Sequence, residues 1–303
     1  MNILLDNVNF SSSSGPNSFG RKIAKSFIEK GHNIDIQSAD EVDVILTFIM
    51  SSLKSKFSPM VQRLDGIYFN EAQDYNALNS PIRMTYEMSD AVIFQSNFNK
   101  QLTEKYFGVH NNSAVIRNGT SLEDIEKIMP LKHHAIDGFE EVWTCASSWR
   151  PHKRLKENIR YFLEHASEKT CLIVAGNNPD YNINHPRVFY VGPCDWVTLI
   201  SLYKRSSKFI HLAWLDHCPN VVVDARAAGC KIICSSAGGT KEIAGTEAIV
   251  FEEDEWDFSP VRLYQPPDID FTRVYNNNSE EVSLNIHDVA DDYLNVFKSV
   301  VLK

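Results

Sequence analysis

The chain has 303 residues, of which 43% are hydrophobic and 23% are charged, so a packed core is feasible and a disordered chain is not favoured. The formal net charge of −9 argues against a protein that coats nucleic acid, because phosphate binding needs clustered Lys and Arg. The six cysteines include no C-x-x-C pair, so we expect free thiols in a reducing compartment rather than a zinc or dithiol motif.

The opening run MNILLDNVNF lacks the basic and long apolar regions of a signal peptide. No apolar stretch approaches the ~20 residues that a membrane helix needs. We therefore expect a cytoplasmic protein. The sequence leaves peripheral membrane association open, although residues 1–117 show no strongly basic surface.

In the first half, short β-rich runs alternate with amphipathic stretches. We expect a helix that ends at Gly31, a helix over 70–89 that is broken near Pro81, and a helix that Ser96 caps and Gly108 ends. The expected strands are 3–6, 33–37, 42–49, 60–64, 91–95 and 113–116.

After a connector over 120–138, the alternation restarts. The expected strands are 142–146, 171–176, 188–192, 209–212, 231–234 and 249–251, and the helices between them are 153–166, 195–205, 220–228 and a short one after Gly239. Residues 252–285 are predicted to be irregular, and an amphipathic helix starts at His287. Two such series predict two doubly wound α/β domains with parallel sheets, 1–117 and 118–286, whose ligands bind beyond the carboxyl ends of the strands.

The strongest local signal runs from Leu215 to Gly229, where a strand leads through a loop into a helix. Asp216 lies on the loop, Pro219 favours the first helical turn, and Asp224 lies further along the helix. The free N–H groups of a helix start suit a phosphate, and a carboxylate can accept two hydrogen bonds from a ribose diol. The alternative, that both aspartates only complement the helix dipole, is equally favoured by this stretch alone.

A basic loop follows the first strand of the second series, with the sequence Ser-Ser-Trp-Arg-Pro-His-Lys-Arg over residues 147–154. Such a run is often a solvated loop. Its position at the carboxyl end of a strand favours a phosphate clamp that includes Arg150, Lys153 and Arg154.

Three further turns carry weaker signals. Gly238 and Gly239, before Thr240, allow backbone N–H groups to approach an anion, although a plain tight turn explains them equally well. The run that contains Gly15 is too irregular for a dinucleotide fingerprint. The Asp65–Gly66 pair is typical of an ordinary turn.

Taken together, the stretches 147–153, 216–229 and 238–242 resemble family 4 of the retaining glycosyltransferases, which have the GT-B fold. The hallmark of that family is a pair of acidic residues separated by seven positions, matched by Asp216 and Asp224 with aspartate in place of the usual glutamate. The resemblance runs through nearly the whole chain and is densest over 143–245. It implies two Rossmann-like domains facing across a cleft, and a last helix (287–303) that crosses back onto the first domain.

The resemblance also implies roles for individual residues. Asp224 binds the donor ribose, Asp216 contacts the transferring sugar, and Lys153 neutralises the donor diphosphate. The donor contacts also include the backbone N–H groups of Asn220 and Val221, together with Gly15, Gly239 and Thr240. Asp65 is the candidate on the acceptor side.

The chain departs from the family pattern at two places. The family places an arginine five positions before the lysine, where this chain has Ser148, and we hypothesise that Arg150 or Arg154 replaces that charge. Pro219, which has no N–H, stands within the family's glycine-rich run, so one phosphate contact is lost.

These features predict transfer of a sugar from a nucleotide-sugar donor to a glycan, lipid or other acceptor, with retention and without a metal or cofactor. Retention comes from the resemblance alone. Two alternatives are a nucleotide-sugar epimerase on the same fold and a non-catalytic module that binds sugar nucleotides or glycans. The sequence does not name the base, the sugar or the acceptor.

Overall fold

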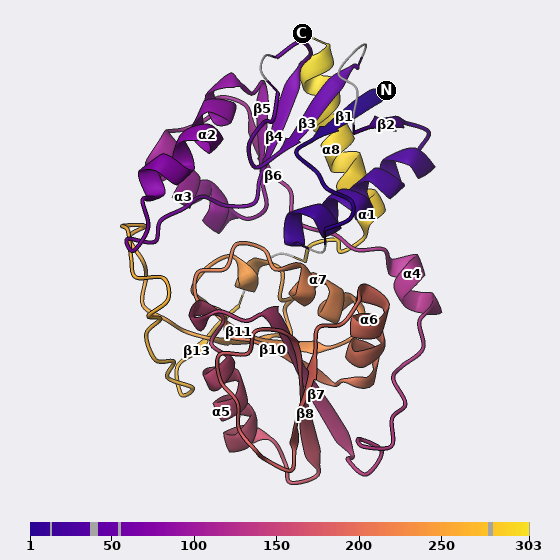
Figure 1. The fold of residues 1–303 in the computed structure, drawn as a ribbon, viewed down its shortest axis with the longest axis vertical. Coiled ribbons are helices and arrows are strands. Elements are labelled where there is room, and N and C mark those ends of the chain that lie inside the picture. The colour runs from indigo at the N-terminus through magenta and orange to yellow at the C-terminus, as the bar shows by residue number, and fades with distance from the viewer. Residues whose placement is uncertain (13, 37–41, 54–55, 278–280, 303) are drawn as a thin grey trace. The chain divides into compact units, whose positions relative to one another are not determined.

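The computed structural model describes residues 1–12, 14–36, 42–53, 56–277 and 281–302. The chain forms two compact units (Figure 1). Unit 1 contains Met1–Ser121, Phe258–Val261 and Ser283–Lys303, and unit 2 contains Leu122–Asp257 and Arg262–Val282.

Unit 1 is built on a parallel sheet with the strand order β2-β1-β3-β4-β5-β6. These strands are β1 (Asn2–Asp6), β2 (Asn33–Asp35), β3 (Val44–Phe48), β4 (Met60–Leu64), β5 (Ala91–Phe94) and β6 (Ser113–Val115). The helices of the unit are α1 (Gly15–Glu29), α2 (Tyr75–Met88), α3 (Asn97–Phe107) and α8 (Ile286–Val301). Strands β3 and β4 are buried along their whole length, as expected for a parallel sheet with helices on both faces.

The main core of unit 1 lies between the sheet and the pair α1 and α8, which pack against each other. Phe27 and Phe297 are both fully buried, and their ring centroids lie 5.7 Å apart. Helix α8 thus completes the core of unit 1, although the segments of unit 2 precede it in the sequence. Figure 1 shows α2 and α3 on the other side of the sheet.

Unit 2 is built on a sheet with the order β13-β12-β11-β10-β7-β8-β9, in which only the short β13 is antiparallel to its neighbour among the described pairs. Its strands are β7 (Glu141–Ser148), β8 (Thr170–Asn177), β9 (Val188–Gly192), β10 (Lys208–His211), β11 (Lys231–Ser235), β12 (Ile249–Phe251) and β13 (Val274–Tyr275). Its helices are α4 (Leu122–Lys127), α5 (Leu155–His165), α6 (Trp196–Arg205) and α7 (Asn220–Ala227), with the short 3-10 helices η1 (Pro151–Lys153) and η2 (Thr240–Glu242). One core packs α5 on the sheet, and a second packs Leu202 of α6 against β7 and β8.

The predicted fold class of two doubly wound α/β domains is confirmed. The predicted cap of α3 is also confirmed, since the Ser96 hydroxyl accepts the N–H of Asn99 at 3.1 Å. Of the helices formed by described residues, none has the length and apolar character that crossing a membrane requires.

Three local predictions were wrong. Helix α2 continues through Pro81 instead of breaking there, because its inner face is buried and this packing offsets one lost backbone hydrogen bond. The connector contains α4, whose Ile125 is buried. The predicted irregular tail adds β13 to the sheet of unit 2, and its segment Phe258–Val261 joins unit 1, where the amide of Val261 donates to Phe69 O at 3.1 Å.

Candidate functional site

Three loops at the carboxyl edge of the unit 2 sheet meet at Asp216. Strand β7 leads into η1, strand β10 leads into the loop that contains Asp216, and strand β11 leads into the Gly238-Gly239 turn. Asp216 and Gly238 form an isolated parallel bridge, and the Gly239 amide donates to Asp216 O at 2.7 Å. A Cβ at Gly238 would lie 2.6 Å from that oxygen, and the φ of +103° also requires glycine. The turn therefore serves to hold the Asp216 backbone.

The side chain of Asp216 is the centre of an ionic cluster. Its Oδ2 accepts from Lys153 Nζ at 2.5 Å and contacts His211 Nε2 at 2.9 Å, while its Oδ1 accepts from the His217 amide at 3.1 Å. The side chains of Lys153 and Asp216 keep exposed fractions of 17% and 14%. Two of the predicted catalytic residues, 63 positions apart in the sequence, are therefore in direct contact and still reachable by a ligand.

The electrostatics of this cluster favour one cation and one anion. Burial opposes ionisation of Asp216, but the Lys153 ammonium and the His211 hydrogen bond hold the pKa of the carboxyl well below its usual range. Burial lowers the pKa of His211 despite the Asp216 charge. Burial and the neighbouring Lys153 lower the pKa of His152 to about 3, and burial lowers that of His217 to about 4. The three imidazoles are thus neutral at pH 7, and Lys153 supplies the positive charge.

The basic loop divides into exposed and buried parts. Trp149 anchors it, because its indole N–H donates to Ala175 O at 3.0 Å. Ser148 and Arg150 are exposed, and among the described residues no hydrogen bond or ion pair partner of the Arg150 guanidinium is found. Arg150 is therefore available to a ligand anion.

Arg154 belongs to the buried part of the loop. Its guanidinium is fully buried and makes two 2.7 Å hydrogen bonds to the carboxylate of Glu253 and a third bond, of 2.6 Å, to Pro267 O. The residue has a positive φ of 54°, which ends η1 and starts α5. Arg154 thus fastens the segment after β12 to the loop, and this arrangement does not support its predicted contact with a donor.

Helix α7 follows the Asp216 loop and carries the predicted donor contacts. Asn220 and Val221 form its first turn after Pro219, and Asp224 lies on its buried side. The Asp224 Oδ2 accepts from the indole N–H of Trp196 at 3.1 Å. Sequence analysis missed Trp196, which is the first residue of α6 and is 28 positions away.

Thr240, in the turn after β11, is fully buried, and its hydroxyl has no hydrogen bond partner among the described residues. Gly239 precedes it and caps η2. The hydrogen bond from the Gly239 amide to the Asp216 carbonyl brings this turn next to Asp216.

The two predicted residues of unit 1 lie on different segments, Gly15 in a helix and Asp65 in a loop. Gly15 is the first residue of α1, after Ser14. Asp65 follows β4, where its Oδ1 accepts from Arg63 and, at 2.6 Å, from the amide of Gln95. Burial raises the pKa of the Asp65 carboxyl, although Arg63 opposes the shift.

Arg63, which the sequence analysis did not single out, organises this part of unit 1. Its side chain is fully buried, it donates to Asn118 Oδ1 at 2.8 Å, and its guanidinium lies 4.1 Å from the ring centroid of Phe19. Asn118 in turn donates to Gln95 Oε1 at 2.9 Å. Asp65 is therefore held in a polar network whose partners are far apart in the sequence and could not be predicted from a local pattern.

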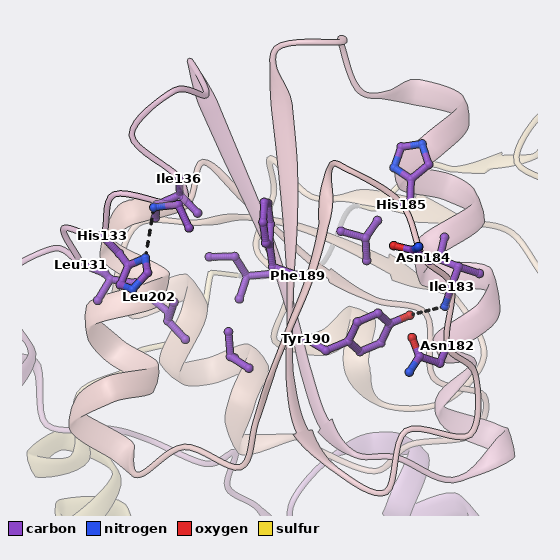
Figure 2. Close-up of a pocket in the computed structure, with 14 residues that line it drawn as sticks. Leu131, His133, Ile136, Asn182, Ile183, Asn184, His185, Phe189, Tyr190 and Leu202 are labelled. Atoms are coloured by element: carbon purple, nitrogen blue, oxygen red, sulfur yellow. Dashed lines mark hydrogen bonds between the residues drawn. The ribbon is translucent and has the colours of Figure 1, made fainter.

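A separate pocket of about 540 Å³ lies at β9, the edge strand of the unit 2 sheet (Figure 2). Phe189 and Tyr190 of β9 point to opposite sides, toward the loop of Leu131 to Ile136 and toward Asn182 to His185, respectively. Neither Lys nor Arg is among its described lining residues, and it includes none of the predicted site residues. Its mostly apolar lining does not suit a diphosphate.

Comparisons with known proteins identify the fold. No family model matches the chain, and no curated protein matches its sequence. Among solved structures, the chain is similar to sucrose-phosphate synthase from Thermosynechococcus elongatus, with a TM-score of 0.64, 13% identity, and coverage of 100% of this chain and 96% of that chain. It is also similar to HepE from Anabaena in complex with UDP-glucose, with a TM-score of 0.61, 14% identity, and coverage of 99% and 92%.

A third similar structure is WaaG, a glycosyltransferase of lipopolysaccharide biosynthesis, with a TM-score of 0.59, 12% identity, and coverage of 100% of this chain and 98% of that chain. The likeness spans at least 99% of the chain in all three comparisons. The chain therefore has the GT-B fold.

Proposed function

We propose that the chain is a glycosyltransferase that takes a sugar from a nucleotide-sugar donor bound mainly by unit 2. The observation that carries the proposal is the 2.5 Å contact of Lys153 with Asp216 on loops beyond the carboxyl ends of parallel strands. In open α/β sheets this edge is where ligands bind. The similar structures include one that holds UDP-glucose, which supports a donor of that class.

In the proposed reaction, the bond between the anomeric carbon and the β-phosphate oxygen breaks, and its electron pair stays on the phosphate. The acceptor hydroxyl oxygen bonds to that carbon and loses its proton to the departing phosphate or to solvent. Lys153, exposed Arg150 and the amides of Asn220 and Val221 stabilise the growing negative charge. These groups do so without a metal or cofactor, which is part of the proposal.

The two carboxylates take separate roles in this proposal. Asp216, whose carbonyl accepts from the Gly239 amide and whose carboxylate contacts Lys153 and His211, accepts a hydrogen bond from a hydroxyl of the transferring sugar. Asp224, with Trp196 beside it, accepts from the ribose. Gly239 and Thr240 lie next to Asp216 and contact the sugar or phosphate. Retention of the anomeric configuration is included in the proposal.

The acceptor side is assigned to unit 1. Asp65 offers a buried carboxyl beside Arg63, and its Oδ2 has no hydrogen bond partner among the described residues. Such a group can accept from an acceptor hydroxyl. Gly15, at the start of α1, is proposed to contact the donor phosphates. The acceptor is a glycan, a lipid-linked sugar or another hydroxyl compound.

A thermal-shift screen against UDP-, GDP-, ADP- and dTDP-glucose tests donor binding, because a ligand that binds only the folded state raises the melting temperature. We expect one of them to stabilise the wild type and to lose most of that effect in Lys153→Ala. Lys156→Ala is the matched control, because Lys156 is exposed on α5 three positions away. No shift with any donor would contradict the proposal.

Incubation with the donor alone distinguishes a transferase from an epimerase. Without an acceptor, a transferase releases nucleoside diphosphate only slowly and leaves the remaining donor unchanged. Conversion of the donor to its epimer, followed by NMR of the anomeric proton, would instead support the isomerase. Donor binding with neither release nor conversion, even with a panel of acceptors, would support a binding module.

A further inference from the structure

His211 is a buried histidine at the end of a strand, directly beneath the candidate site. It is the last residue of β10, pairs in register with Cys234 of β11, and is 3% exposed. Its ring lies nearly parallel to that of Phe209, with 6.3 Å between the centroids. The strand and this packing position the imidazole beside the loop that carries Asp216.

The imidazole and the Lys153 ammonium share one oxygen of Asp216. His211 Nε2 lies 2.9 Å from Oδ2, and Lys153 Nζ lies 2.5 Å from the same atom. Burial lowers the pKa of His211, so the ring is neutral, while Asp216 is ionised and can only accept. The proton of His211 must therefore reside on Nε2, and the ring donates to the carboxylate.

We propose that His211 is a positioning residue, which holds the Asp216 carboxylate in place when Lys153 turns to the donor diphosphate. This inference rests on the function proposed above. The side chain of Asp216 is only 14% exposed, and a carboxylate with so little access to water needs hydrogen bond donors. Once Lys153 moves away from Asp216, the described residues that still donate hydrogen bonds to its carboxylate are His211 and the backbone amide of His217.

The same contact also eases the release of Lys153. Because Oδ2 keeps the His211 hydrogen bond, breaking the ion pair does not leave that oxygen without a partner. If His211 could not donate, Asp216 would depend on Lys153 more strongly. The diphosphate would then bind more weakly, and the carboxylate would be less ordered beside the sugar.

The test compares His211→Leu, which removes the donor at similar volume, with His211→Gln, whose side-chain amide can donate to the same oxygen. Calorimetry measures the Kd of whichever of UDP, GDP, ADP and dTDP binds the wild type most tightly. A coupled assay measures the release of that nucleotide from its glucose derivative. We expect His211→Leu to raise Kd and to lower kcat, each by roughly 10- to 100-fold, and His211→Gln to stay close to the wild type.

The background variant Asp216→Asn separates positioning from a general effect on folding. If His211 acts through Asp216, adding His211→Leu to this background should cause little further change in Kd or kcat. Additive losses would overturn the proposal, as would equal losses in the Leu and Gln variants. Chemical denaturation of each variant checks that it is folded at the assay temperature.

A ligand-free measurement adds a second criterion. Nitrogen-15 NMR of the imidazole should show the Nε2–H tautomer in the wild type, and an Nδ1–H tautomer would overturn the proposal. A wild type that binds none of the four nucleotides overturns the proposed function and this role together. A wild type that binds, with a His211→Leu variant indistinguishable from it, overturns only the role of His211.

Discussion

Replacing Asp216 by Asn should tighten the binding of a nucleoside diphosphate while abolishing most of the sugar transfer. The Lys153 ammonium lies 2.5 Å from the Asp216 carboxylate. A diphosphate that needs this ammonium must therefore compete with Asp216. The substitution keeps the shape of the side chain, removes its charge and leaves Lys153 available.

The size of the effect follows from the contact that has to be broken. Hydrogen bonds to charged groups contribute about 1.5–3 kcal/mol in proteins. The side chains of Lys153 and Asp216 are 17% and 14% exposed, so solvent screens the pair only in part. Removing the competition should thus lower the Kd of the nucleoside diphosphate by roughly 10- to 100-fold.

Isothermal titration with the free nucleoside diphosphate is the suitable assay, because that ligand lacks the sugar that Asp216 is proposed to hold. The matched control is Glu140→Gln. Glu140 and Lys169 also lie 2.5 Å apart, but their side chains are 68% and 69% exposed, so their pairing is expected to contribute little. We expect no change in Kd for the control.

An unchanged or larger Kd in Asp216→Asn would refute the reasoning. It would mean either that Lys153 does not contact the diphosphate or that Asp216 supports the bound nucleotide directly. Retained transfer activity in the same variant would separately contradict the role assigned to its carboxylate.

Three further predictions concern single residues. Arg154→Met should lower the free energy of unfolding, measured by chemical denaturation, by about 3–5 kcal/mol, because it leaves the buried Glu253 carboxylate without its partner. A much smaller decrease would contradict the structural role of this ion pair. Trp196→Phe should weaken nucleotide binding by roughly 3- to 10-fold, because Asp224 loses an N–H donor while an aromatic ring remains at the start of α6. An unchanged Kd would exclude this role. The pKa of Asp216 is depressed in the folded state, so its charge stabilises the protein above the ordinary Asp pKa, and this contribution is lost as pH falls through the folded-state value. The stability gap between wild type and Asp216→Asn should therefore be constant near pH 7 and shrink only in strong acid, and a gap that grows with acidity would contradict it.

Sequence patterns were sufficient to predict the fold class, because the spacing of apolar residues indicates where strands and helices form. The alternation of strands and helices predicted two doubly wound α/β domains, and Ser96 caps its helix as its type and position indicate. The same logic placed Lys153, Asp216 and Gly239 near one another, because parallel strands bring their carboxyl ends to one edge of the sheet. Helix α2, which continues through Pro81, shows the limit, since buried packing outweighed a local preference there.

Tertiary structure alone decided which of the candidate side chains are available. Lys153 and Arg154 are adjacent cations that were both predicted to contact the donor, yet Lys153 pairs with Asp216 at an accessible edge and Arg154 is buried against Glu253, 99 positions away. The pairing of Trp196 with Asp224 likewise depends on where α6 and α7 come together, and that of His211 with Asp216 depends on how the loop after β10 folds back over the strand end. A sequence pattern reports the local period of a chain, whereas the partner of a charged side chain is set by topology and by the free energy of burying that charge.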